Sequence, residues 1–365
     1  MITKPKYLYL HVPFCRTICS YCDFCHVGYQ EIVANQWLDA IKVDIQNRHI
    51  NENLQTIYIG GGTPTALSSS QLDQLLSLLD PYARMVQEYT IEINPETFDE
   101  DKAKILQKHG VNRASIGFQT SDEKLLQMMN RHHRLEDVAE TMRLLRKYGI
   151  DNISLDLMYS LPTQTMESLE KSLQDAIALE PTHLSLYSLT IEPNTVFAKK
   201  GYEHLEDDIE ADMYEWICNF LPKYGFVQYE ISNFAKENMI SIHNCAYWNY
   251  QDFYGIGCGA SGLEGSTRYD IPKNVKKYIE DSSIKDTIEL TLQEQMFEAV
   301  MMGLRLKEGM NIQLFEDRFH TSVLEVYRAQ INKLCHEGKL ELGGNCLRCS
   351  EEGFEILNSI LLEFM

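Results

Sequence analysis

The chain has 365 residues, and its 44% hydrophobic content is typical of a globular protein with one large domain and one or two smaller ones. Its 33 basic and 53 acidic residues give a net charge of -20, which opposes attraction to nucleic acid or to an anionic membrane surface. No apolar run approaches the roughly 18 residues of a membrane span, and the N-terminus leads into a strand rather than a signal peptide, so we expect a cytoplasmic protein. Ten cysteines in that compartment are expected to be ligands or buried hydrophobic residues rather than disulfides.

Short apolar segments alternate with amphipathic segments along the first half of the chain. The apolar segments have the length of strands, and the amphipathic segments carry apolar residues at helical spacing. Six strand-helix units predict an α/β fold with a parallel sheet, a partial (β/α)6 barrel with its helices outside. Ligands of such barrels bind at the carboxyl ends of the strands. The predicted strands are 7–12, 56–59, 89–93, 114–118, 153–158 and 183–189, and the predicted helices are 36–47, 71–79, 101–109, 135–148 and 166–179.

A tight cluster of cysteines follows the first predicted strand. Cys15, Cys19 and Cys22 have the spacing C-x-x-x-C-x-x-C, so a loop must curl their thiolates around something that they share. Structural zinc usually takes four ligands in two pairs, whereas three close thiolates suit a cubane iron-sulfur cluster that leaves one iron open. Cys22 to His26 also match C-x-x-C-H, the attachment motif of c-type haem. That reading leaves Cys15 and Cys19 without a role and requires an export signal, so we favour the cluster.

Polar residues stand at the ends of several predicted strands. A glycine-rich run at 60–65 lets backbone amides approach a ligand closely. Glu92 and Asp156 lie within apolar strands, where a carboxylate is costly to bury unless it is paired or hydrogen-bonded. Gln119 ends the fourth strand, and Arg131 follows a short helix. Each alone could be structural, but together they favour a ligand with amino-acid and nucleoside parts.

The segment 201–290 is dense in aromatic residues and glycine, and it contains His243-Asn-Cys-Ala-Tyr-Trp248. His243 is either an ordinary packed histidine or an axial ligand of a flat iron-containing ring lined by Tyr247 and Trp248. The sequence does not decide between these two interpretations.

The last segment, 291–365, reads as three helices, a strand pair around 339–345 and a final helix. This order resembles a small winged-helix module, and the acidic balance favours protein contact or packing over DNA binding. We therefore expect a partial barrel at 1–200, the aromatic middle segment at 201–290 and a mostly helical winged-helix-like domain at 291–365.

The cysteine motif, with the aromatic Tyr21 before its last cysteine, resembles the radical S-adenosylmethionine (SAM) superfamily. The resemblance narrows to the oxygen-independent coproporphyrinogen III oxidases and their HemW-type haem chaperone relatives, and it spans nearly the whole chain. The segments that carry it are 9–22, 59–65, 92–96, 115–119, 155–165, 184–187 and 243–248.

This resemblance implies that Cys15, Cys19 and Cys22 bind a 4Fe-4S cluster, whose open iron is chelated by the amino and carboxylate groups of SAM. It also implies an electron donor such as flavodoxin or ferredoxin, and cleavage of SAM to methionine and a 5'-deoxyadenosyl radical. The positions that surround SAM in the family are occupied here by Tyr9, Tyr21, Gly61, Gly62, Thr63, Glu92, Gln119, Arg131 and Asp156.

Two features separate the branches of this family. The oxidases have a fourth cysteine two residues after the third, where this chain has Phe24, and the HemW-type pattern Cys-Asp-Phe-Asn differs only at Cys25. The His-Asn-x-x-Tyr-Trp element of the chaperone branch is intact, which implies haem binding by His243, and the long N-terminal extension of the oxidases is absent. We therefore expect a haem chaperone that delivers haem to respiratory membrane proteins and reaches the membrane only through them.

Three questions stay open at this point. The chain could instead be a coproporphyrinogen III oxidase or another radical SAM enzyme acting on a tetrapyrrole, because the cofactor motifs are complete. A regulatory protein that uses its winged-helix-like module is a weaker alternative. The sequence decides neither the role of Cys25 nor whether the chain forms a homodimer.

Overall fold

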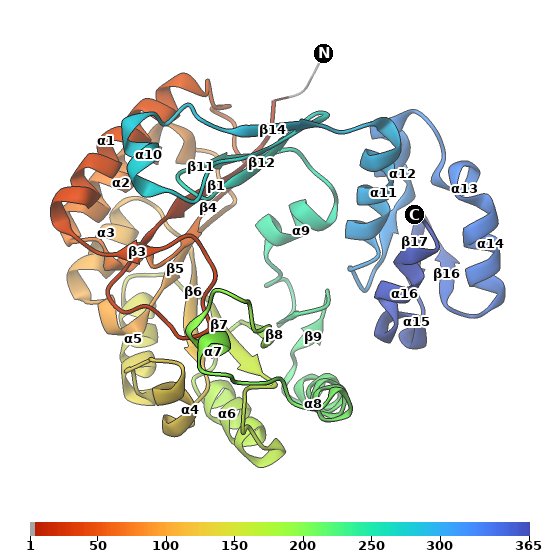
Figure 1. Cartoon of the computed structure of the whole chain (residues 1–365), viewed down its shortest axis with the longest axis horizontal. Coiled ribbons are helices and arrows are strands. Elements are labelled where there is room, and N and C mark those ends of the chain that lie inside the picture. Colours follow the sequence, from red (N-terminus) through yellow and green to blue (C-terminus); the bar gives the residue numbers. More distant parts are fainter. Residues whose placement is uncertain (1–3) are drawn as a thin grey trace.

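A computed structural model describes residues 4–365, and its centre is a sheet in which all six predicted strands pair in parallel with their neighbours (Figure 1). Each observed strand begins and ends within two residues of the predicted one. The cysteine loop after β1 is framed by a short parallel pair, β2 (Phe14–Cys15) and β3 (Val27–Gly28). The six strands are β1 (Tyr7–Val12), β4 (Thr56–Gly61), β5 (Glu88–Ile93), β6 (Arg113–Gln119), β7 (Asn152–Tyr159) and β8 (His183–Ser188).

The predicted helices follow their strands and cover the outer face of the sheet (Figure 1). Most begin at a side chain that caps the first turn, such as Ser68 before α2 and Thr165 before α6. The first helix starts at Glu31 rather than 36; its first turn combines the exposed Ile32 with the buried Ala34. The helices are α1 (Glu31–Asn47), α2 (Ser69–Ala83), α3 (Glu100–Lys108), α4 (Glu123–Met128), α5 (Leu135–Lys147) and α6 (Met166–Ala178), with 3-10 turns η1 (Pro64–Ala66) and η2 (Pro95–Thr97).

Six further strands, which the sequence did not predict, extend the sheet at both sides. On one side β11 (Phe253–Ile256) pairs in parallel with β1, and three antiparallel strands follow it. On the other side two strands add to β8. The resulting order is β14-β13-β12-β11-β1-β4-β5-β6-β7-β8-β10-β9. The added strands are β12 (Ser261–Glu264), β13 (Thr267–Asp270), β14 (Asp286–Glu289), β10 (Asn233–Ala235) and β9 (Val227–Gln228).

Helix α9 (Ile242–Trp248) carries the predicted haem element and lies between the sheet and the C-terminal domain (Figure 1). It joins β10 on one side of the sheet to β11 on the other, so this short segment crosses the opening of the barrel. Helix α7 (Val196–Lys199) precedes the middle segment, whose remaining elements are α8 (Asp207–Phe220), η3 (Leu221–Tyr224) and α10 (Val275–Glu280).

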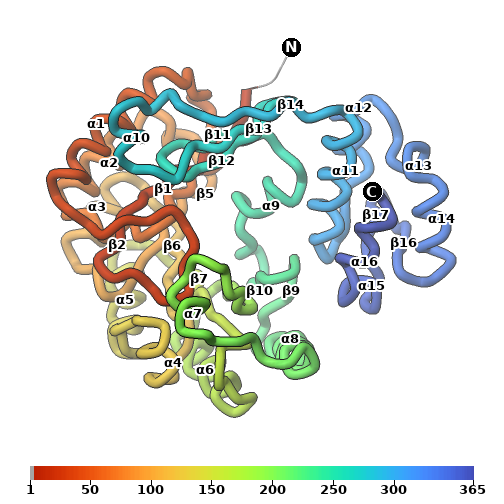
Figure 2. Tube along the Cα trace, viewed as in Figure 1, coloured from red at the N-terminus to blue at the C-terminus, as the bar shows by residue number. Residues whose placement is uncertain are grey.

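The C-terminal domain is mostly helical, as expected, and it packs to one side of the barrel (Figure 2). The predicted strand pair is present and gains a third strand, which gives the antiparallel order β15-β17-β16. Its apolar residues form a core of their own, to which Tyr250 and Leu263 also belong. Its elements are α11 (Leu292–Gly303), β15 (Met310–Asn311), α12 (Ile312–Phe319), α13 (Val323–Val326), α14 (Arg328–His336), β16 (Leu340–Gly343), β17 (Cys346–Cys349), α15 (Glu351–Glu355) and α16 (Leu357–Leu362).

The two faces of the barrel strands differ in character. On β6, Ala114, Ile116 and Phe118 belong to the apolar core beneath the helices, whereas the alternate residues from 113 to 119 face the interior. The interior of the barrel is therefore polar and open to a ligand. Among the described residues, no helix combines the length and apolar character that crossing a membrane requires.

Candidate functional site

The cysteine loop holds its three thiols at one end of the barrel. Cys15 ends β2, and its sulfur accepts a hydrogen bond from the Thr63 hydroxyl at 3.7 Å. The loop is tied to the segment after α4, because the Ser20 amide donates to the Met129 carbonyl at 2.9 Å. Asn130 also donates its side-chain amide to the Ile18 carbonyl at 2.7 Å. These bonds fix the loop before any cluster is present.

All but two of the predicted site residues surround one cavity of about 410 Å³. This volume lies within the range of ligand pockets in proteins, roughly 300 to 1,000 Å³. The exceptions are Tyr9, which lies behind Tyr58 and bonds to His11, and His243. The structure thus brings together residues from five strands and three loops. Those that line the cavity are Cys15, Cys19, Tyr21, Cys22, Gly61, Gly62, Thr63, Glu92, Gln119, Arg131 and Asp156.

The thiols fit an iron-sulfur cluster better than a single metal ion. Within residues 4–365, no three His, Cys, Asp or Glu side chains converge tightly enough to hold one ion. A cubane cluster needs no such convergence, because each thiolate binds a different iron. Burial, with a smaller contribution from the neighbouring thiols, raises the pKa of Cys15 to about 12 and that of Cys22 to about 11. Bound iron would reverse this, since a metal ionises the thiols that coordinate it.

Two glycines keep the cavity open. Gly61 has φ +114°, and a Cβ added there would lie 2.7 Å from the His11 ring. A Cβ at Gly117 would lie 2.8 Å from Nη2 of Arg131. Neither position therefore has room for a side chain, and at Gly117 the colliding residue, Arg131, itself lines the cavity.

The cavity wall carries two carboxylates with hydrogen bonds already made to protein. Glu92 accepts bonds from the Tyr58 hydroxyl and the Gly61 amide, both at 3.0 Å, and burial raises its pKa to about 7, with a further contribution from Asp156. Both oxygens of Asp156 accept from the Ser115 hydroxyl, at 2.9 and 3.0 Å, and burial raises its pKa as well. Such groups can accept hydrogen bonds from the hydroxyls or amino group of a ligand.

Arg131 supplies positive charge beside the thiols. Its Nη2 donates to the Tyr21 hydroxyl at 3.4 Å, and its Nε is buried without a hydrogen-bond partner among the described residues. A buried guanidinium with free donors suits a carboxylate. At this end of the cavity the donor set therefore fits both a cluster and the charged part of an amino acid.

His243 lies at the opposite end, on α9, and is only 1% exposed. Its Nδ1 lies 2.6 Å from the Thr56 hydroxyl and its Nε2 lies 2.8 Å from the Tyr247 hydroxyl. Burial lowers the pKa of His243 to about 3, so the ring is neutral. The Glu88 carboxylate accepts the backbone amides of Ile242 and His243, at 2.8 and 2.9 Å, and holds the helix against β5. In this arrangement neither ring nitrogen is open to iron.

Cys25 does not join the other three cysteines. It is 6% exposed, its sulfur lies 3.3 Å from that of Cys258, and it does not line the cavity. Its carbonyl oxygen lies 2.8 Å from Nε2 of His11. The fourth cysteine of the loop is thus turned into the core beside β11.

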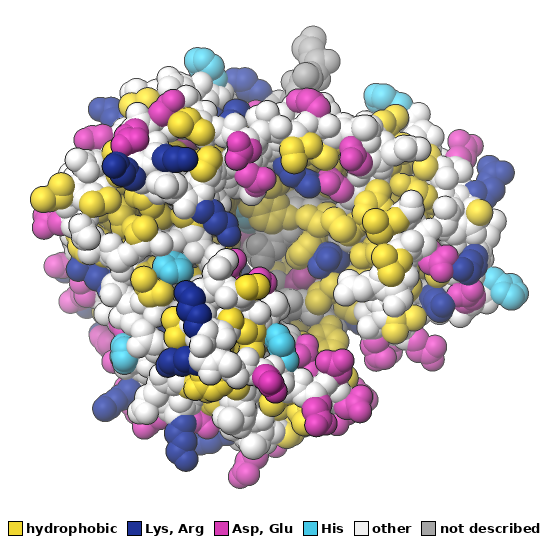
Figure 3. Space-filling model, viewed as in Figure 1, with side chains coloured by type: hydrophobic (Ala, Val, Ile, Leu, Met, Phe, Trp, Pro, Cys, Tyr) yellow, Lys and Arg dark blue, Asp and Glu magenta, His cyan; other side chains and the backbone are white. Residues whose placement is uncertain are grey.

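A hollow lined by hydrophobic side chains separates the barrel from the C-terminal domain (Figure 3). Figure 1 places α9 and α11 at this hollow. The partly exposed apolar residues of these helices include Tyr247, Trp248, Phe297, Met301 and Met302. An apolar surface of this kind next to a polar cavity suits an amphipathic ligand.

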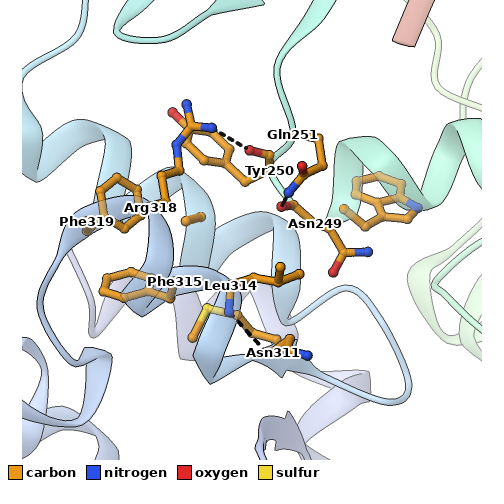
Figure 4. Close-up of a pocket in the computed structure, with 11 residues that line it drawn as sticks. Asn249, Tyr250, Gln251, Asn311, Leu314, Phe315, Arg318 and Phe319 are labelled. Carbon is orange, nitrogen blue, oxygen red and sulfur yellow. Dashed lines mark hydrogen bonds between the residues drawn. The ribbon is translucent and has the colours of Figure 1, made fainter. Parts of the chain in front are cut away.

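A second, much smaller cavity of about 20 Å³ lies between the end of α9 and α12 (Figure 4). It has room for about one water molecule. Arg318 stacks 4.7 Å from the Tyr250 ring, donates to the Tyr250 carbonyl at 3.1 Å and forms an ion pair with Asp252 at 2.9 Å. This region therefore joins the C-terminal domain to the turn after α9 and is not a ligand site.

The sequence did not point to several residues of the large cavity. Arg113, Tyr58, Tyr187 and Asn244 line it together with the predicted set. Arg113 could have been found from the alternation of polar and apolar residues between 113 and 119, whereas Asn244 reaches the cavity only because α9 crosses the barrel opening.

Comparisons with known proteins agree with this geometry. The sequence model of the Radical SAM superfamily matches residues 9–176, and that of the HemN C-terminal domain matches residues 290–356. The heme chaperone HemW of Lactococcus lactis is 36% identical over 100% of this chain and 98% of its own length. HemW of Bacillus subtilis is 36% identical over 99% of both chains, and HemW of Escherichia coli is 32% identical over 99% and 98%. The coproporphyrinogen III oxidase HemN of Escherichia coli, a radical SAM enzyme, shares the fold, with a TM-score of 0.84 and 22% identity over 99% of this chain and 90% of that one.

Proposed function

Because this chain belongs to the radical SAM superfamily and, within it, to the HemW family of haem chaperones, we propose that it binds haem and passes it to acceptor proteins. The observation that carries this proposal is the position of α9. The helix reaches the polar cavity through Asn244, carries the partly exposed Tyr247 and Trp248, and lies between the sheet and the C-terminal domain, where the apolar hollow is found. A ligand with a flat apolar ring and charged groups matches both surfaces.

Membership of the superfamily implies a 4Fe-4S cluster and SAM. We propose that Cys15, Cys19 and Cys22 hold the cluster, and that the other predicted residues of the cavity, with Tyr9 behind them, hold SAM. When bound, these groups supply an electron and a source of the 5'-deoxyadenosyl radical. The chain's own contribution is to orient SAM through Gly61, Glu92 and Asp156 and to keep the loop anchored.

We propose His243 as the haem ligand, with one condition that follows from its contacts. Its Nε2 must exchange the Tyr247 hydroxyl for iron, or its Nδ1 must leave Thr56. Haem binding through His243 therefore requires that one of these two hydrogen bonds breaks. Loss of one neutral hydrogen bond costs about 1 kcal/mol, which a coordinate bond to iron readily offsets.

We also propose the finer biological setting. The acceptors are respiratory haem proteins, the electron donor is a flavodoxin or ferredoxin, and the protein works in the cytoplasm, where it reaches the membrane only through its acceptors. The net charge of -20 opposes direct binding to anionic lipid, which supports a membrane contact made only through the acceptors. Size-exclusion chromatography with light scattering, with and without haem, tests whether the chain forms a homodimer.

The experiment that tests the function is an anaerobic haem titration of the reconstituted protein. We expect a stable change in the Soret absorbance with wild type, its loss in His243→Ala, and no loss in His336→Ala, which removes an exposed histidine. In parallel, 5'-deoxyadenosine and porphyrin products are measured with SAM, dithionite and coproporphyrinogen III. Absence of any Soret change would refute the chaperone proposal, and conversion to protoporphyrinogen would make the protein an oxidase despite Phe24.

A further inference from the structure

Arg113 is a buried cation without a counter-ion in contact. It is the first residue of β6, it is 2% exposed, and its side chain lines the large cavity. Within residues 4–365 its guanidinium makes no hydrogen bond and no ion pair, and its Nε is buried without a partner. Buried arginines are normally paired, because an unpaired charge in a protein interior is costly.

The nearby carboxylates do not pair with Arg113, since each has other partners. Asp156 lies close enough for Arg113 to influence it, but its oxygens accept from Ser115 at 2.9 and 3.0 Å and from Ser154 at 3.4 Å. Glu92 accepts from Tyr58 and from the Gly61 amide. The planar fork of five N–H donors on Arg113 is therefore free for a ligand.

Arg113 and Arg131 mark opposite ends of the cavity. Arg131 lies beside the cysteines and Gly117, whereas Arg113 acts on His243 and His183. Along β6, four residues separate Arg113 from Gly117, which corresponds to about 13 Å of strand. One ligand group bound beside the cysteines cannot also occupy the free donors of Arg113.

We propose that Arg113 anchors a carboxylate at the α9 end of the cavity, and that this carboxylate is a propionate of the tetrapyrrole cargo. This inference rests on the proposed haem function. A guanidinium binds a carboxylate through two parallel hydrogen bonds. With a propionate on Arg113, the macrocycle extends past Asn244 toward the apolar hollow. Since Glu92 and Asp156 already place negative charge in the cavity, a single carboxylate fits it better than a phosphate dianion.

The same chemistry could come from the methionine carboxylate of SAM, so the experiment separates the two sources. Deuteroporphyrin IX, a metal-free dicarboxylic porphyrin, and its dimethyl ester are titrated by fluorescence into reconstituted wild type, Arg113→Met and Arg113→Lys. The Met variant has similar length without charge, and the Lys variant keeps the charge without the fork. SAM affinity is measured on the same proteins by equilibrium dialysis.

We expect wild type to bind the diacid more tightly than the diester. Arg113→Met should weaken diacid binding roughly tenfold to a hundredfold, as loss of a charged hydrogen-bonded pair does, with diester binding within twofold of wild type. The affinity of Arg113→Lys for the diacid should fall between those of wild type and Arg113→Met. Circular dichroism checks that each variant is folded. If the Met variant is not folded, the Lys variant tests whether Arg113 binds the propionate.

Three results would overturn the inference. Equal weakening of diacid and diester, or none, would show that Arg113 binds no propionate. A loss of SAM affinity as large as the loss of diacid affinity would assign the carboxylate to SAM. The chaperone function is judged separately with haem: if wild type binds haem and Arg113→Met keeps all of it, the inference fails while the function stands. If haem does not bind but the diacid shows the predicted loss, the function fails while the carboxylate site stands.

Discussion

The two ends of the barrel cavity differ in how completely their polar groups are satisfied. At the cysteine end, three thiols are held at cavity positions, and the Nε of Arg131 has no hydrogen-bond partner within residues 4–365. At the α9 end, His243 has a partner on each ring nitrogen, and Glu88 accepts two amides of the helix. The cysteine end is preformed for a ligand. At the α9 end, Arg113 has no partner among the described residues, but His243 must exchange an existing hydrogen bond before it can bind a ligand.

The largest effect is expected from breaking the preformed end. Replacing Cys15, Cys19 or Cys22 with Ser should abolish the cluster, because the remaining loop cysteine faces Cys258 and provides no substitute. Iron and sulfide content and visible absorbance measure the loss. The matched control is Cys335→Ser, a partly exposed thiol on α14, which should keep the cluster. Loss of iron in Cys25→Ser would contradict the comparison, since it would make Cys25 a ligand.

The next effect concerns Gly61, a glycine of the cavity wall that has no room for a side chain. Gly61→Ala should lower the free energy of unfolding by about 3 kcal/mol, because positive φ and a collision with His11 both oppose the methyl group. Gly110→Ala has φ +75° but no atom within 4 Å, so it should cost only about 1 kcal/mol. Urea unfolding of the apoprotein measures both. Equal losses would mean that the collision with His11 contributes nothing.

A pH effect is expected from Glu92, which faces Asp156, Tyr58 and His11. Its pKa is raised from 4.5 to about 7, so the folded apoprotein binds its proton more tightly than the unfolded chain does. The stability from this proton is complete below about pH 4.5 and is lost as the pH rises through 7, by at most about 3 kcal/mol. From pH 5 to 8, wild type should therefore lose stability relative to Glu92→Gln. Parallel curves for the two proteins would refute this, and the exposed Glu136→Gln serves as control.

The smallest effect concerns the hydrogen bonds of His243 at the α9 end of the cavity. Tyr247→Phe removes the hydrogen bond on Nε2 of His243 and should speed haem association about fivefold, the equivalent of about 1 kcal/mol. Stopped-flow absorbance measures the rate, and Tyr224→Phe, at an exposed tyrosine, is the control. An unchanged or slower rate would show that the Tyr247 bond does not limit access to His243.

The six barrel strands were predictable because each is an apolar run between helical patterns. The strands of the middle segment were not, because β9 to β14 are two to four residues long and glycine interrupts several of them. Strands this short are stabilised by their neighbours in the sheet rather than by a pattern of their own. The same cause hid the parallel pairing of β11 with β1.

For the candidate site, sequence reasoning located residues but not their states. Strand-end positions led to Glu92, Gln119 and Asp156, which do meet at one cavity. Nothing in the sequence shows that His243 has both nitrogens occupied, because Thr56 is 187 residues away along the chain. Arg113 stands just before the apolar part of its strand, so its place inside the barrel emerges only when the strand alternation is followed to its first residue.

The contacts of Arg318 link the C-terminal domain to the segment that follows α9. Arg318, on α12, donates a hydrogen bond to the Tyr250 carbonyl and forms an ion pair with Asp252. These residues lie two and four positions after the last residue of α9. The C-terminal domain is therefore connected directly to the segment that follows the helix carrying His243. The two ends of α9 are therefore tied to different parts of the molecule, its start to β5 through Glu88 and the segment after it to α12 through Arg318.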